Sequence, residues 1–68
     1  MNKKELLYDA LAKHYLAERV EAEATLHVYF NDSVGIGEHP QMVEEMVKQV
    51  DKMANAEDCL EVLKRNFS

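Results

Sequence analysis

Two histidines in the first half of the chain stand at spacings that could present metal ligands on a helix. His14 lies four residues before Glu18 and seven before Glu21. Glu23 lies four residues before His27. Residues at such spacings share one side of a helix, and imidazole and carboxylate groups are common zinc ligands. A di-iron bundle, however, uses Glu-x-x-His motifs on facing helices, and no Glu stands three residues before either histidine. We therefore expect a solvated polar face, with no metal and no other cofactor.

Cys59 and Ser33 are the candidates for nucleophilic catalysis. Cys59 lies in the acidic segment AEDCLE, where negative charge disfavours the reactive thiolate. Ser33 lacks the flanking glycines of a hydrolase nucleophile elbow. Since no residue stands out as a nucleophile or as its base, we expect that the protein is not an enzyme.

The segment NDSVGIGEHP, residues 31–40, holds both glycines and the single proline of the chain. Backbone N–H groups that precede a helix can bind a phosphate, which makes four residues candidates for a loop site: Gly35, Gly37, Glu38 and His39. The segment lacks the Lys and the Ser or Thr of a P-loop, and no strand precedes it. A structural turn accounts for more of its residues than a site does. An anionic ligand such as a nucleotide signal, bound by the 34–40 loop and the start of the following helix, is the alternative function.

The stretches on either side of this segment contain neither Gly nor Pro and are rich in strong helix formers. Asn2, with Glu5 three positions later, is a variant of the capping box and predicts a helix over residues 3–30. Pro40 suits a first helical position, so the second helix is predicted over residues 40–67. Two helices of equal length with a connecting loop at 31–39 predict a single domain, residues 1–68. Its fold class is all-α, an antiparallel two-helix hairpin.

The predicted first helix carries two apolar stripes with seven-residue spacing. The first stripe, an alanine seam, runs beside Leu6, Val20 and Val28 and consists of Ala10, Ala17 and Ala24. The second stripe contains Tyr8, Leu11, Tyr15, Ala22, Leu26 and Tyr29. One packed helix covers only one such stripe, so the other predicts pairing into a four-helix bundle or a larger helical homo-oligomer. The association face is whichever stripe the second helix leaves free. Two readings stay open: a monomer whose second helix and loop wrap both stripes, and a surface kept for a foreign partner.

The predicted second helix has a heptad pattern typical of a coiled coil. Apolar residues recur every seven positions at Met46, Met53, Leu60 and Phe67, with Val43 and Val50 in the alternate seam position. Glu57 and Lys64 occupy the next two positions of the series that begins with Val43 and Val50. The apolar stripe is therefore predicted to shift onto Ala56 and Leu63.

Charge and composition exclude several classes of function. The chain of 68 residues carries 13 acidic and 8 basic side chains, a net charge of −5, and no segment of it is basic. We therefore expect no direct binding of nucleic acid, and a nucleic-acid mimic would need denser acidity on one face. The N-terminal stretch MNKKELLYDALAKHY is too polar for a signal peptide or a membrane span, and one cysteine suits a reducing cytoplasm.

The run ATLHVYFNDSVGIGEHPQMVEEMVKQVDKMANAEDCLEVL, residues 24–63, resembles short uncharacterised proteins of large tailed bacteriophages. In those proteins a V-G-I-G-E-H-P segment joins two helices, and an A-E-D-x-L-E-V-L ending follows. The resemblance brings no activity or binding residues. It implies a small accessory protein, either a virion component or a modulator of a host protein. Together with the two apolar stripes, this predicts a function through helix-mediated protein–protein interaction and self-association. Its location would be the cytoplasm of an infected bacterium or the virion.

Overall fold

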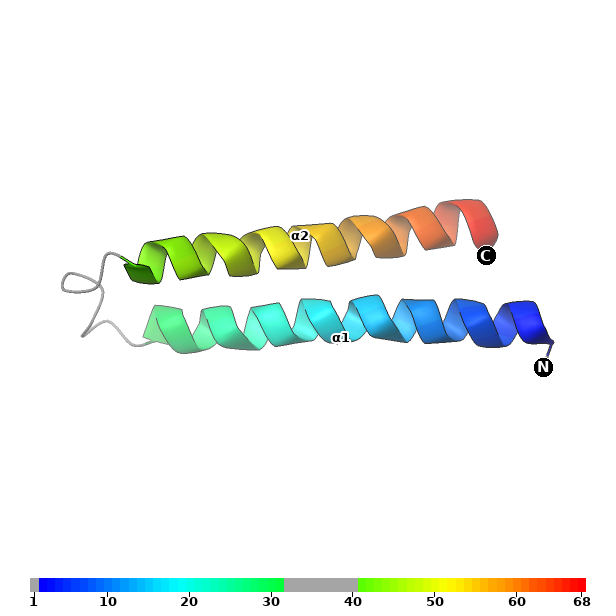
Figure 1. Ribbon diagram of the computed structural model, residues 1–68, viewed down its shortest axis with the longest axis horizontal. Helices are drawn as coiled ribbons and strands as arrows, with labels where there is room; N and C mark the ends of the chain where they lie inside the picture. The colour runs from blue at the N-terminus through cyan, green and yellow to red at the C-terminus, as the bar shows by residue number, and fades with distance from the viewer. Residues whose placement is uncertain (1, 32–40) are drawn as a thin grey trace.

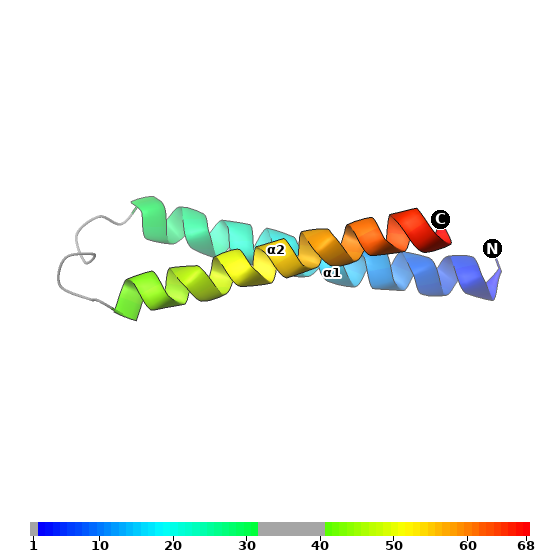
Figure 2. The ribbon, with the colours of Figure 1, turned by 90° about the horizontal axis from the view of Figure 1, so that it is seen from above.

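The computed structural model describes residues 2–31 and 41–68, which form two long helices side by side (Figure 1). Helix α1 spans Lys3–Asn31 and α2 spans Gln41–Phe67, and no strand occurs within these ranges. The helices run antiparallel, so both ends of the chain lie at the same end of the pair (Figure 1). Figure 2 shows that the two axes are inclined to each other. The predicted all-α helical hairpin is therefore confirmed.

The start of α1 has the capping arrangement that the sequence indicated. The backbone N–H of Glu5 donates to Oδ1 of Asn2 over 2.8 Å, and the Asn2 amide lies 3.4 Å from Oε1 of Glu5. The N–H of Leu6 also donates to the Asn2 carbonyl over 3.1 Å. A side-chain cap of this kind satisfies N–H groups that have no partner inside the helix and stabilises it by about 1 kcal/mol.

The other ends of the helices also use local hydrogen bonds. Asn31, expected to begin the loop, is the last residue of α1, and its side-chain amide donates to the carbonyl of His27 over 2.8 Å. Lys64 and Arg65 lie in the last turn of α2, where positive charge complements the helix dipole. The predicted loop site at Gly35, Gly37, Glu38 and His39 lies outside the described residues, as does Pro40.

The tyrosine stripe is the side of α1 that packs against α2. Tyr8, Tyr15 and Tyr29 are half-buried, Ala22 is fully buried, and Leu26 is only 8% exposed. The alanine seam lies on the opposite side, because Ala24 is two residues from both Ala22 and Leu26 and each residue turns the helix by about 100°. The structure thus decides which of the two predicted stripes α2 covers.

The side of α2 that faces α1 agrees with the heptad prediction except at Val43, Val50 and Phe67. Met46, Met53 and Leu60 are at least half-buried, as predicted. In the alternate seam position, Ala56 and Leu63 lie on this side as predicted, whereas Met42 and Gln49 stand there in place of Val43 and Val50. The predicted residues Val43, Val50 and Phe67 are more than half exposed. Glu57 and Lys64 are exposed, in agreement with the predicted shift of the stripe onto Ala56 and Leu63.

The hairpin has a very small core. Of the described residues, only Ala22, Leu26 and Ala56 are buried, and both alanines are fully inaccessible to solvent. Two small side chains at the middle of the contact let the helix backbones approach closely. Most large apolar side chains of the described residues nevertheless stay at least a third exposed: Leu6, Leu7, Leu11, Leu16, Val20, Val28, Phe30, Val43, Val47, Val50, Val62 and Phe67.

Candidate interaction surface

The side of α1 that points away from α2 carries an exposed strip of apolar residues that is interrupted by Lys13, and we call it the α1 outer face. It consists of Leu6, Ala10, Ala17, Val20, Ala24 and Val28, and every one of them is exposed. The exposed fractions of Leu6, Val20 and Val28 are 53%, 49% and 65%. The strip runs along most of the helix, since residues 6 and 28 are separated by about 33 Å at 1.5 Å per residue. Apolar surface of this extent on a small chain is a mark of an interaction site.

The other predicted interaction residues lie elsewhere. Tyr8, Tyr15, Leu26 and Tyr29 belong to the contact between α1 and α2, and their burial follows from that contact. Leu11, also in the tyrosine stripe, is 46% exposed at the margin of the same contact. Of the two predicted sets, only the alanines Ala10, Ala17 and Ala24 remain wholly on a free surface.

Lys13 lies on the α1 outer face, because it is seven residues from both Leu6 and Val20. Nζ of Lys13 lies 2.8 Å from Oδ2 of Asp9 one turn earlier, and this carboxylate raises the pKa of Lys13 above its ordinary value through a hydrogen bond and charge attraction. Nε2 of His14 lies 3.5 Å from Oε1 of Glu18. The apolar strip is therefore interrupted by one ion-paired lysine in its first half.

The middle of the hairpin is joined by an ion pair between the helices. Nζ of Lys52 in α2 donates a hydrogen bond to Oε1 of Glu21 in α1 over 2.8 Å. This hydrogen bond lowers the pKa of Glu21 and raises the pKa of Lys52. The pair is exposed to water, so it contributes to the alignment of the helices more than to their stability.

His14, His27 and Cys59 are the histidine and cysteine residues that the structure describes. No group of three His, Cys, Asp or Glu side chains that could hold a metal ion occurs among residues 2–31 and 41–68. Cys59 is half-buried on the α1 side of α2, where its sulfur lies 4.0 Å from Oδ1 of Asn55. A hydrogen bond with Cys59 raises the pKa of the Tyr15 phenol, and negative charge on Cys59 adds to the effect. Cys59 therefore has a packing role against Tyr15.

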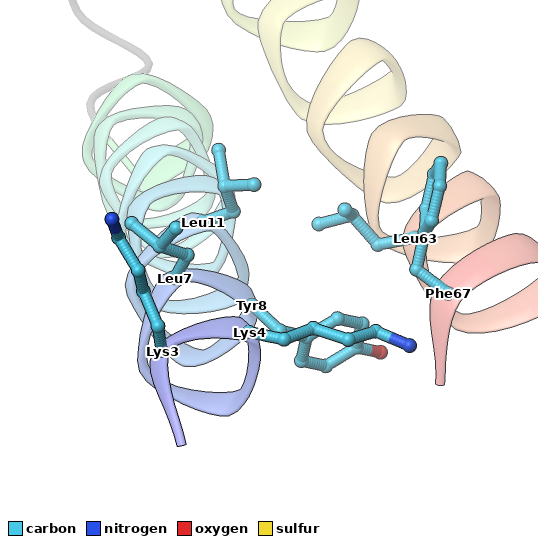
Figure 3. Close-up of a pocket in the computed structure, with 7 residues that line it drawn as sticks. All are labelled: Lys3, Lys4, Leu7, Tyr8, Leu11, Leu63 and Phe67. Atoms are coloured by element: carbon cyan, nitrogen blue, oxygen red, sulfur yellow. The ribbon is translucent and has the colours of Figure 1, made fainter.

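A groove at the open end of the hairpin was not predicted from the sequence. It has a volume of about 450 Å³, and α1 and α2 both line it, with apolar residues at its sides and two lysines at its rim: Leu7, Tyr8, Leu11, Leu63, Phe67, Lys3 and Lys4. Figure 3 shows Tyr8 reaching from α1 towards α2 with Lys4 alongside it, and Leu63 pointing back towards α1. The groove forms because an antiparallel hairpin brings the first and last turns of the molecule together. The pairs Leu7–Leu11 and Leu63–Phe67, each spaced by four, were the available sequence signal.

A second exposed apolar strip lies on α2. Val43, Val47, Val50 and Ala54 follow one another at spacings of four, three and four, and all of them are exposed. Because the strip is shorter than the α1 outer face and covers only the first half of α2, we regard it as the weaker interaction surface.

Comparisons with known proteins identified no relative of this chain. A scan against protein-family models, a search of curated proteins and a search of solved structures each gave no match to this chain. Neither α1 nor α2 contains a stretch that is both long enough and apolar enough to cross a membrane.

Proposed function

We propose that this protein is a small accessory protein of the phage type that works by helix-mediated association, with a second copy of the chain as its first partner. The observation that carries this proposal is the distribution of apolar residues around α1. The helix is apolar on two opposite sides, and α2 covers only one of them. A helix that is apolar on both sides is typical of the interior of an assembly.

The size of the chain supports the same proposal. A chain of 68 residues buries only about 60% of the surface that it exposes when unfolded. In this hairpin only three of the described residues are buried. Covering the α1 outer face would bring Leu6, Val20 and Val28 out of water. Full burial of such a side chain contributes about 1.5–3 kcal/mol, and roughly half of that remains to be gained because these residues are already partly covered.

The sequence resemblance supports the biological part of the proposal. Phage accessory proteins of this size include virion components and modulators of host proteins, and both act by contact with other proteins. In this proposal the hairpin contributes no catalytic group and no cofactor. The self-associated form presents its remaining apolar surfaces, including the α2 strip, to a virion or host protein.

Sedimentation equilibrium tests the proposal directly. The wild-type chain should sediment with at least twice its mass of 7.8 kDa at tens of micromolar, and Ala17→Glu should shift it towards the monomer, because a carboxylate would have to be buried in the interface. Ala54→Glu is the matched control on the α2 strip and should leave the mass unchanged. A wild-type monomer at these concentrations would contradict the proposal, and dissociation by Ala54→Glu alone would move the interface to α2.

A further inference from the structure

We infer that the groove at the open end of the hairpin binds a single-chain amphiphile with an anionic headgroup, with the chemistry of a fatty acid. In the bound form the alkyl chain lies between Leu11 and Leu63, and the carboxylate lies at the end of the groove that Lys3 and Lys4 border. This inference goes beyond the proposed self-association and concerns a different part of the molecule.

The walls of the groove are apolar on both helices. Leu7 and Leu11 line it from α1, and Leu63 and Phe67 line it from α2. Figure 3 shows Leu63 pointing back towards α1, with Leu7 and Leu11 on the opposite wall. Leu7 and Phe67 are more than half exposed, and Leu11 is 46% exposed. A bound alkyl chain would therefore remove apolar surface of both helices from water, which is favourable.

Two lysines give one end of the groove a positive charge. Lys3 and Lys4 are exposed, so their alkyl stems can extend the apolar lining while their ammonium groups stay in water. Figure 3 shows Lys4 alongside Tyr8, with the polar ends of both side chains directed towards α2. None of the described residues that line the groove is acidic. An anionic headgroup at this end would meet two cations and no like charge.

The acids that are close to these lysines in the sequence have other partners. Oε1 of Glu5 lies 3.4 Å from the side-chain amide of Asn2, and Oδ2 of Asp9 lies 2.8 Å from Nζ of Lys13. Neither lysine at the rim forms an ion pair with any of the described residues. Both ammonium groups are therefore available to an anionic ligand.

The open end of the hairpin also differs in charge from the rest of the chain. Residues 3–11 and 60–67 hold four of the eight basic side chains but only three of the thirteen acidic ones. The remainder of the chain is strongly acidic and repels anions. An anionic amphiphile is therefore attracted to this end of the molecule and to no other described part of it.

The size of the groove suits a small ligand better than a protein segment. Its volume of about 450 Å³ lies within the roughly 300–1,000 Å³ of small-molecule sites, which combine a mostly apolar lining with a few polar groups. Along α1 it extends from Lys3 to Leu11, about 12 Å at 1.5 Å per residue. A stable protein–protein contact buries about 1,000 Å² or more, which a groove two helical turns long does not supply.

Isothermal titration calorimetry with decanoate, below the concentration at which it forms micelles, tests the apolar wall. The wild-type chain should bind decanoate, and Leu7→Glu should weaken binding at least about tenfold, because the new carboxylate would be covered by the ligand. Leu7 is 57% exposed, so this variant should keep the helical hairpin, which circular dichroism verifies. Leu16→Glu makes the same change at a 44% exposed position outside the groove and should bind decanoate like the wild type.

A comparison of decanoate with 1-decanol tests the lysines, because the alcohol has the same alkyl chain without the charge. Lys3→Gln combined with Lys4→Gln should weaken decanoate binding about fivefold, as expected for the loss of two exposed charge pairs, and leave 1-decanol binding unchanged. Lys64→Gln combined with Arg65→Gln removes the same charge from the same end of the hairpin, outside the groove. This control should leave decanoate binding nearly unchanged.

Three results would overturn the inference. They are the absence of decanoate binding to the wild-type chain, equal weakening by Leu7→Glu and Leu16→Glu, and equal weakening by the two double variants. The last result would mean that the anion responds only to the net charge of the open end. Because the groove shares no residue with the α1 outer face, the sedimentation test of self-association can succeed or fail independently of these titrations.

Discussion

Lys52 in α2 and Glu21 in α1 are 31 residues apart in the sequence, yet their charged groups lie within 2.8 Å of each other. Each stands beside the buried centre of the hairpin. Glu21 directly precedes Ala22, and Lys52 lies one turn before Ala56. The two alanines are fully buried. The ion pair therefore borders the part of the contact where the two helices pack without solvent between them.

A small part of the hairpin's stability should be lost in acid because of this pair, which is exposed to water and therefore screened. Lys52 lowers the pKa of Glu21 below its ordinary value of 4.5. A carboxyl group with a lowered folded-state pKa contributes stability that is present above its unfolded pKa and is lost as the pH falls through the folded one. Urea unfolding between about pH 6 and pH 3 should show this loss, and Glu21→Gln should reduce it. Glu57→Gln, at an exposed position of α2, is the control, and an equal effect of both variants would contradict the role of the pair.

Truncation of Leu26 should lower the free energy of unfolding more than truncation of an exposed leucine in α1. Leu26 is 8% exposed, whereas Leu16 is 44% exposed. Leu26→Ala removes buried methyl groups and leaves a cavity, so we expect a loss of about 2–4 kcal/mol in the free energy of unfolding. Leu16→Ala makes the same chemical change at a solvated position and should cost less than about 1 kcal/mol. Urea titrations at one fixed protein concentration make this comparison, and equal losses would mean that α2 does not cover the tyrosine stripe.

Enlargement of Ala56 should separate the helices. Its side chain is fully buried at the middle of the contact, so Ala56→Leu has no space for the added carbons. We expect a loss of about 1–3 kcal/mol from overpacking. Ala54→Leu adds the same volume at an exposed position two residues away and should change stability by less than about 0.5 kcal/mol. Thermal unfolding followed by circular dichroism distinguishes the two, and a stabilising Ala56→Leu would show that the helices do not approach closely there.

The titration of Tyr15 should report on the contact with Cys59. Cys59 raises the pKa of the Tyr15 phenol above 10.0, mainly through a hydrogen bond. The neutral phenol therefore favours the folded state, a contribution that is present below the unfolded pKa and is lost as the pH rises through the folded one. Cys59→Ala should lower the pKa of Tyr15, which NMR of the tyrosine ring can follow. Cys59→Ser keeps a hydrogen-bonding group and should retain part of the shift, while an unchanged pKa in Cys59→Ala would contradict the contact.

Part of the candidate surface could be predicted from the sequence. The seven-residue spacing of Ala10, Ala17 and Ala24 identified them as one strip, because residues seven apart lie on one side of any helix. The groove at the open end was not predicted, because Leu7 and Leu63 stand near opposite ends of the chain and only the antiparallel contact brings them together. The α2 strip was missed as well, since Val43 and Val50 had been assigned to the seam.

The sequence by itself determined that this protein forms two helices, since helix propensity, the Asn2 cap and the position of Pro40 are local properties of the chain. It also determined that α1 has two apolar stripes. Only the tertiary structure decided which stripe packs inside. Tyr15 and Leu26 were as plausible on a free surface as Ala17, because periodicity describes the sides of one helix and not its neighbour. The choice depends on how two surfaces fit: the tyrosine stripe has the larger side chains and so buries more apolar area against α2, with Ala22 leaving room at the centre, and the alanine seam faces away.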